Sequence, residues 1–329
     1  MRGVAARTSV ALPFDRQETH EPAPARARPR TWRGIVPFAL AVTLLLSGAP
    51  PARGAGSVVR HVIRTWQWTT PSPDPTGIDF LPSGQLVVTD SEVEETRLDQ
   101  HRNVWRITRA GHVERTRHTL RFSREPTDVA VDGSHNRWFF SDDAQAGGII
   151  FVIRLGPDHT YGTDDDRRRS FSTADFGSRD PEGLAYGGGY LWLSDGSNRT
   201  IYRIDPGPNG AFEGADAGGT ETDDVIRKRQ LDGLGIRDLE GIERAPNGHL
   251  FVLPGTRDPD ILEIDFSDGS LIRRYDLTSA HLRNPSSIAY GPSSRDPSKR
   301  SVYITDRGVD NQSDPNENDG RIVEVGIRR

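Results

Sequence analysis

Residues 180–204 of this 329-residue chain, DPEGLAYGGGYLWLSDGSNRTIYRI, decide the fold. The stretch contains three apolar runs, GLAY, YLWLSD and TIYRI, which are separated by turns rich in Gly, Ser and Asn. Alternating apolar residues between such turns predict β-strands joined by tight connections. A weaker fourth run, VIRKRQL, follows at 225–231. The stretch therefore predicts a four-stranded antiparallel sheet.

The same pattern occurs five times along the chain. The units begin at Asp74, Glu125, Asp180, Asp238 and Asn284, at intervals of 51, 55, 58 and 46 residues. Four short strands that recur every ~40–50 residues are typical of β-propeller blades. We predict an all-β fold, a β-propeller of four-stranded blades, with five blades counted. Six blades is the alternative, and it requires one blade hidden in the long insertions.

The fifth unit ends at the C-terminus without a fourth strand. The run VVRHVIRTW at 58–66 precedes the first unit and has no partner near it in the sequence. We expect this N-terminal strand to complete the last blade and close the ring, which leaves no open sheet edge.

Composition excludes several classes of protein. The chain is 34% hydrophobic, is rich in Gly and Pro, and has no cysteine. It therefore has no disulfide framework, thiolate metal site or thiol nucleophile.

The N-terminal residues predict export. An Arg-rich flank precedes an apolar run at 35–46, and small residues follow at 47–49. This order is typical of a secretory signal, and the run is shorter than the ~20 residues of a membrane span. We predict a signal and leader over 1–55, cleaved between Ala49 and Ala55, and one propeller domain over 56–329. An uncleaved N-terminal anchor is the alternative to a secreted, periplasmic or cell-surface location.

Without residues 1–55, the chain holds 34 basic and 44 acidic residues, a net charge of −10. A surface this acidic argues against nucleic-acid binding, which needs a basic surface. We expect a monomer with no membrane insertion after cleavage.

The strand start PEG-[LI] and the pattern G-x-[LI]-x-[VL]-x-D…I-x-x-I resemble the SdiA-regulated, NHL and senescence marker/gluconolactonase-like propellers, and also the phytase-like esterase propellers. The resemblance covers 74–327 and implies a divalent cation, often calcium, near the central channel. Members include lactone hydrolases, phosphoesterases and proteins of no known activity. Lactonase members place a metal-binding Glu on the inner strand of the first blade, where this chain has Thr76. This departure weakens the lactonase assignment.

Acidic residues gather at one mouth of the predicted channel. Antiparallel strands bring the starts of the first strands and the ends of the second strands to one face. The first-strand group is Asp74, Glu125, Asp180, Asp238 and Asn284, with Glu182 and Glu240 two residues further on. The second-strand group is Asp90, Asp142, Asp195 and Asp306, and the loops behind it add Glu92, Glu94, Glu95, Asp143, Asp258 and Asp260.

Clustered carboxylates repel one another unless a cation or a proton intervenes, and oxygen ligands without Cys favour Ca²⁺ or Mg²⁺. The predicted metal ligands are Asp180, Glu182, Asp238 and Glu240. For the second-strand aspartates we prefer a structural role, in which they hydrogen-bond nearby backbone.

An arginine directly precedes four of the unit starts, at Arg124, Arg179, Arg237 and Arg283. We prefer salt bridges between blades for these residues. The alternative is a basic collar, with Arg179 and Arg237 gripping a carboxylate or phosphate.

A second candidate calcium site lies in DRGVDNQSDPNENDG, residues 306–320. Its alternating oxygen side chains are Asp310, Asp314, Asn316, Asn318 and Asp319. The glycine and the final Glu of an EF-hand are missing from their places, so the segment is either an irregular calcium loop or a solvated polar turn. The loops at 156–166 and 207–224 belong to the opposite face, where we expect flexible solvated loops.

No catalytic motif is present. We predict a secreted calcium-binding propeller that acts as an extracytoplasmic binding or scaffold module for a small molecule, protein or glycan. The alternative is a metal-dependent hydrolase of a lactone, ester or phosphoester, with Glu182 or Glu240 as the catalytic base.

Overall fold

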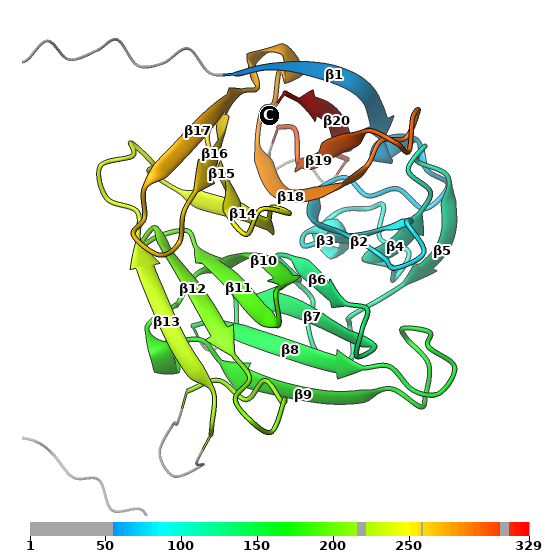
Figure 1. Cartoon of the computed structure of the whole chain (residues 1–329). Coiled ribbons are helices and arrows are strands. Elements are labelled where there is room, and N and C mark those ends of the chain that lie inside the picture. The colour runs from blue at the N-terminus through cyan, green and yellow to red at the C-terminus, as the bar shows by residue number, and fades with distance from the viewer. Residues whose placement is uncertain (1–54, 146, 216–221, 258, 310–315, 329) are drawn as a thin grey trace, which may run out of the picture. The chain divides into compact units, whose positions relative to one another are not determined.

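The computed structural model describes residues 55–329, apart from 146, 216–221, 258, 310–315 and 329. The described chain is all-β, with twenty strands and four single-turn 3₁₀ helices (Figure 1). None of these described helices has the length and hydropathy of a membrane span. The predicted signal at 1–55 lies outside the described residues except for Ala55.

Three sheets contain four antiparallel strands each. The first sheet comprises β2 (Pro75–Phe80), β3 (Leu86–Asp90), β4 (Val104–Ile107) and β5 (Val113–Arg117). The second comprises β6 (Val129–Asp132), β7 (Arg137–Asp142), β8 (Ile149–Arg154) and β9 (Arg167–Ser172). The third comprises β10 (Pro181–Gly187), β11 (Tyr190–Asp195), β12 (Thr200–Asp205) and β13 (Val225–Gln230).

The remaining strands form one eight-stranded sheet in the order β14-β15-β16-β17-β1-β20-β19-β18. Its strands are β14 (Leu239–Arg244), β15 (Leu250–Pro254), β16 (Asp260–Ile264), β17 (Leu271–Asp276), β18 (Pro285–Pro292), β19 (Arg300–Asp306), β20 (Arg321–Ile327) and β1 (Ala55–Arg64). The 3₁₀ helices are η1 (Thr65–Gln67), η2 (Val93–Glu95), η3 (Ala174–Phe176) and η4 (Thr278–Ala280).

The N-terminal strand joins the two halves of the eight-stranded sheet. β1 pairs antiparallel with β20 from Ser57 opposite Ile327 to Arg64 opposite Arg321. It also meets β17 in parallel at Ala55 and Gly56 (Figure 1). This pairing agrees with the prediction that the run at 58–66 completes the last sheet, although the strand begins at Ala55 and Trp66 lies in η1.

The innermost strands, β2, β6, β10, β14 and β18, contact one another in succession, and β18 returns to β2. Small residues permit this approach. A Cβ atom at Gly183 would lie 2.4 Å from the Glu240 carbonyl oxygen of the next inner strand, and one at Gly77 would lie 2.7 Å from the Asp128 Cα. Apolar side chains of the inner and outer strands pack between neighbouring sheets in five buried clusters.

The inner strands β2, β10, β14 and β18 share one irregularity. Their pairing with the second strand shifts register between the first and fourth residues, for example between Pro181 and Leu184. A bulge bends the strand and turns a side chain away from the regular alternation. Glu182 and Glu240 lie within these bulges.

Candidate metal centre

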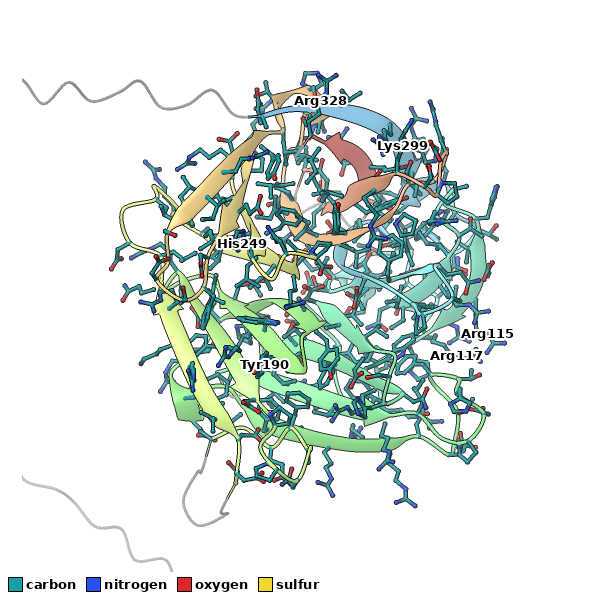
Figure 2. The ribbon with its side chains drawn as sticks, viewed as in Figure 1. Arg115, Arg117, Tyr190, His249, Lys299 and Arg328 are labelled. Carbon is teal, nitrogen blue, oxygen red and sulfur yellow. The ribbon has the colours of Figure 1, made fainter. Side chains whose placement is uncertain are left out.

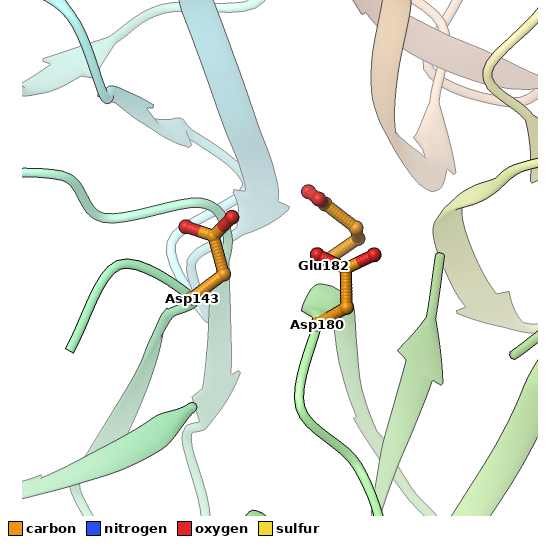
Figure 3. Close-up of side chains that lie close together, drawn as sticks. All are labelled: Asp143, Asp180 and Glu182. Atoms are coloured by element: carbon orange, nitrogen blue, oxygen red, sulfur yellow. The ribbon is translucent and has the colours of Figure 1, made fainter. Parts of the chain in front are cut away.

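Three carboxylates meet where the second and third sheets face each other. Asp143 follows β7, Asp180 precedes β10, and Glu182 is the second residue of β10. One oxygen of each side chain lies within 4.8 Å of the others (Figure 3). The structure thus brings together two of the predicted ligands, Asp180 and Glu182. The third, Asp143, was predicted only as a loop acid on the same face.

The predicted ligands of the fourth unit lie beside this group. A Cβ atom at Gly196 would be 2.9 Å from Asp238 Oδ1 and 3.0 Å from Asp180 Oδ2, so both carboxylates crowd the same glycine. Glu240 is 5% exposed, and its Oε1 would be 2.6 Å from a Cβ atom at Gly255. The absence of a side chain at Gly196 and Gly255 makes room for the acids.

Burial and mutual repulsion act on the two inner-strand glutamates. Burial, with a contribution from Asp238 and Asp180, raises the pKa of Glu240 to about 8. Burial and the Glu240 charge raise the pKa of Glu182 well above its ordinary value. The Arg307 guanidinium lowers both pKa values and only partly offsets this effect.

The carboxylates differ in the donors around them. Asp180 Oδ2 accepts a hydrogen bond of 2.8 Å from the Ser197 backbone N–H. Within the described residues, no donor lies within hydrogen-bonding distance of the Glu182 carboxylate. Glu182 is half-buried, and a carboxylate in such a place that lacks both a protein donor and an adequate counter-charge is a natural ligand for a cation.

Arg307 is the counter-charge of this mouth, and the sequence analysis missed it. Burial tends to lower the pKa of Arg307, but the charges of Glu240 and Glu182 raise it overall. Its Nη1 lies 3.7 Å from Glu92 Oε1, and its buried Nε has no hydrogen-bond partner among the described residues. The signal lay in the repeat, because Arg307 occupies the position after the second strand that Asp143, Gly196 and Gly255 occupy in other units.

Asp74 shows that the acidic mouth extends to the first sheet. The residue is 4% exposed, and burial, with the charges of Asp90 and Glu92, raises its pKa to about 8. The Arg307 guanidinium opposes this shift as well.

The second-strand aspartates have the structural role preferred in the sequence analysis. Asp90 Oδ2 accepts hydrogen bonds from Ser72 Oγ (2.6 Å) and the Asp74 N–H (2.9 Å). Asp195 Oδ2 accepts from Ser178 Oγ (2.7 Å) and the Arg179 N–H (3.0 Å). Hydrogen bonds saturate the carboxylates of Asp90 and Asp195, and these two aspartates thereby position the loops that carry the acidic residues of the mouth.

Among the described residues, the arginines that precede the units form no salt bridge between sheets of the kind preferred in the sequence analysis, and the collar of Arg179 and Arg237 stays a prediction. All four, Arg124, Arg179, Arg237 and Arg283, are exposed. Arg283 pairs with Asp319 at 3.1 Å, within its own sheet. The ion pairs of the described residues include none of the other three. The arginine that acts on the mouth is Arg307.

The second candidate calcium site is described only in part. Asp310 and Asp314 lie outside the described residues. Asn318 Nδ2 donates to the Trp66 carbonyl oxygen (3.3 Å), and Asp319 accepts from the Val309 N–H (3.2 Å) as well as from Arg283. Asn316 takes part in an interaction of its own. Protein groups thus engage Asp319 and the Asn318 amide nitrogen, whereas the buried Asn318 Oδ1 has no hydrogen-bond partner among the described residues.

No family model matches the sequence, and no curated protein matches it. Solved structures do match it in fold. Glutaminyl cyclase from Myxococcus xanthus superimposes with a TM-score of 0.52 at 15% identity, covering 84% of this chain and 98% of that chain.

Two further structures are similar at lower scores. Aldose sugar dehydrogenase from Streptomyces coelicolor, in its PQQ-bound form, gives a TM-score of 0.48 at 15% identity, covering 85% of this chain and 100% of that one. The calcium-binding protein regucalcin from Agrobacterium tumefaciens gives 0.46 at 14% identity, covering 83% and 97%. The Myxococcus xanthus glutaminyl cyclase has a propeller-type fold, and the four-stranded antiparallel sheets of this chain are consistent with the β-propeller class. At such identities the similarity shows the fold and assigns no family.

Proposed function

We propose that this chain is an exported, five-bladed β-propeller that binds calcium at the acidic mouth of its channel and acts as an extracytoplasmic binding module. The observation that carries the proposal is the convergence of Asp143, Asp180 and Glu182 within 4.8 Å. Five successive groups of four strands, the last completed by β1, support the blade count.

The geometry of the carboxylates fits a calcium ion. Calcium takes six to eight oxygen ligands at about 2.3–2.6 Å, so two of its ligands lie at most about 5 Å apart. The oxygens of the Asp143, Asp180 and Glu182 group meet that limit. Asp238 and Glu240 stand beside this group as further oxygen ligands.

Electrostatics supports the same proposal. Burial, together with the charge of Asp180, raises the pKa values of Asp143, Glu182, Asp238 and Glu240, and the Arg307 charge lowers those of Glu182, Asp238 and Glu240. A divalent cation would relieve the repulsion between these carboxylates. Calcium binding should therefore release protons at neutral pH.

The test is a calorimetric calcium titration of the chelator-stripped protein. We expect saturable micromolar binding, weakened at least about 100-fold in Asp180→Asn/Glu182→Gln. Asp319→Asn is the matched control, because it removes one carboxylate from the 306–320 segment and should leave the affinity unchanged. Unaltered binding in the double variant would contradict the proposed site, and no binding to the parent protein would contradict calcium binding altogether.

A metal-dependent hydrolase of a lactone, ester or phosphoester is the second candidate. It rests on Glu240 and Arg307. The pKa of Glu240, about 8, lets this residue hold or release a proton near neutrality, and the buried Arg307 Nε has no hydrogen-bond partner among the described residues. Such a pair supplies an acid–base group and an anion-binding group, while calcium would polarise the substrate's oxygen. Screens with lactones, esters and phosphoesters test this second candidate. Turnover that disappears in Glu240→Gln while calcium binding remains would support the hydrolase. No turnover by the calcium-loaded protein would contradict the hydrolase and favour the binding module.

A further inference from the structure

A cavity of about 350 Å³ lies between the first and second sheets, at the ends of the strands opposite to the acidic mouth. The first sheet contributes the β2–β3 turn and parts of β4 and β5. The second sheet contributes the β6–β7 turn, Trp138 of β7 and the segment that follows β8. The volume lies within the range of about 300–1,000 Å³ typical of small-molecule sites.

The inner wall of this cavity is apolar and aromatic. Val104, Val131, Trp138 and Leu155 line it. The Trp138 ring stacks on Tyr161, with ring centroids 4.7 Å apart and an interplanar angle of 10°. Trp138 and Tyr161 are 8% and 6% exposed, so packing holds both rings in place. The wall offers a rigid flat surface for an apolar group.

Three arginines form the other side. Arg106 of β4 lies directly opposite Arg115 of β5. Arg117 follows Arg115 two residues later on the same strand, and Figure 2 shows these two side chains near each other. Like charges that face each other across two strands are unfavourable unless an anion intervenes.

An acid pairs with only one of these arginines, Arg106, and the ion pairs of the described residues include neither Arg115 nor Arg117. Glu114 Oε2 lies 3.4 Å from Arg106 Nε, yet that buried Nε makes no hydrogen bond to any described residue. Asp132, which also lines the cavity, is saturated by Arg137 at 2.7 Å and by Ser134 at 2.6 Å. The cavity therefore keeps a net positive charge in a chain that is acidic overall.

Elsewhere between the sheets, arginine guanidinium groups lie over aromatic rings. Arg137 lies 4.9 Å above the Phe212 ring, and Arg203 lies 4.3 Å above the Tyr190 ring. In the described part of the chain, no guanidinium covers Trp138 or Tyr161 in this way. Arg117 donates its Nε to the Tyr161 carbonyl oxygen (3.1 Å) and Arg106 faces Glu114, so the exposed Arg115 is the arginine of this cavity that is most open to a ligand.

We propose that this cavity binds a small organic carboxylate with an aromatic or aliphatic body. The body packs on Trp138 and Leu155, and the carboxylate accepts charge-assisted hydrogen bonds from Arg115 and Arg106. The geometry favours a carboxylate over an inorganic anion because the apolar wall has no partner to offer a fully hydrated ion. The site is independent of the calcium centre.

The test is a calorimetric titration of the full, calcium-loaded protein with indole-3-acetate and with the neutral indole-3-acetamide. We expect indole-3-acetate to bind saturably, at least about tenfold more tightly than the amide. Arg115→Gln should reduce the affinity for the acid about tenfold and leave the amide unchanged. Arg227→Gln, an exposed arginine on the outer strand β13, is the matched control and should change neither.

Two filling variants test the place of binding. Leu155→Trp fills the cavity from its wall, and Ser83→Trp covers its rim from an exposed turn, where folding is not at risk. Either should abolish binding of indole-3-acetate. The proposal is overturned if the amide binds as tightly as the acid, if the acid does not bind at millimolar concentration, or if Ser83→Trp binds it normally. Equal binding of inorganic phosphate would also overturn it, in favour of a general basic surface. Binding should persist in chelator, which separates this result from that of the calcium titration.

Discussion

Asp128 and Glu182 are acids at the inner strands, and they differ in exposure and in what surrounds the carboxylate: Asp128 is 1% exposed, whereas Glu182 is half-buried. Asp128 Oδ1 accepts hydrogen bonds from the Ile78 N–H (3.2 Å) and Ser287 Oγ (2.9 Å), and its Oδ2 accepts from the Leu184 N–H (2.7 Å). These donors belong to β2, β18 and β10, so one side chain links three inner strands. Glu182 has no such donor among the described residues.

The difference teaches that the supply of donors together with burial, and not charge alone, separates a structural acid from a candidate ligand. Burial raises the pKa of both residues. The hydrogen bonds to Asp128 favour its ionised form and partly oppose this rise, whereas Glu182 has only the Arg307 charge to oppose it. Four predictions test the comparison.

The largest effect is expected for Asp128→Ala. It leaves buried donors of three inner strands without an acceptor, at about 1–3 kcal/mol each, so the free energy of unfolding should fall by about 3–5 kcal/mol. Guanidinium denaturation measures this change. Asp175→Ala, at an exposed residue, should change it by less than about 0.5 kcal/mol. Equal effects of the two substitutions would remove the distinction drawn for Asp128.

Glu182→Gln should behave in the opposite way. In chelator it removes a buried, repelled charge, and the free energy of unfolding should stay equal or rise. At calcium concentrations about 100 times the dissociation constant, the parent protein should gain about 2.7 kcal/mol, and the variant should not. Thermal melts with and without calcium measure both. A variant that is less stable than the parent in chelator would show that Glu182 is structural after all.

The far end of the channel should make stability depend on pH. Burial raises the pKa of Asp79 to about 7, and burial with the Asp79 charge raises the pKa of Glu243 well above its ordinary value. A raised carboxyl pKa stabilises the folded state at low pH, and this contribution is lost as pH rises from about 4 through 7, by at most about 1.4 kcal/mol per pH unit and proton.

Asp79→Asn should therefore flatten this part of the stability profile, measured in chelator between pH 4 and pH 8. An equally steep profile in the variant would mean that Asp79 titrates normally.

The smallest effects concern the arginines. Arg307→Gln removes the guanidinium that lowers the pKa values of Glu182 and Glu240, so at pH 9, above the pKa of about 8 of Glu240, calcium should bind about fivefold more tightly. Arg237→Gln should change the affinity less than about twofold, because an exposed charge is screened by solvent. Calcium titrations measure the change in affinity in both variants. A larger change in Arg237→Gln than in Arg307→Gln would favour the collar of arginines that precede the units.

Much of the fold could be predicted because it rests on repeated local patterns. The alternating runs, the turns and the unpaired run at 58–66 specify strands, their order and the closing partner. Strand direction also placed Asp180 and Glu182 at one mouth, because it follows from antiparallel pairing alone.

Asp128 and Arg307 could not be assigned in this way, because their roles depend on which side chains cross the channel. Yet the repeat contained a signal for each. Asp128 occupies a position that is glycine in three units, and Ser287, the other exception, donates to it. The cavity between the first two sheets depends on the path of the chain after β8, which no pattern specified.

The pairing of β1 with β20 has a mechanical consequence. Ser57 and Ile327 face each other at the same end of the antiparallel pair. A force that pulls the two chain ends apart therefore loads the hydrogen bonds one after another, beginning at this pair, and never all at once. The strand pair opens like a zipper and offers little resistance to tension. If the chain is tethered through its N-terminus, a pull on the C-terminus would detach β1 first, while the sheets that hold Asp143, Asp180 and Glu182 would stay folded.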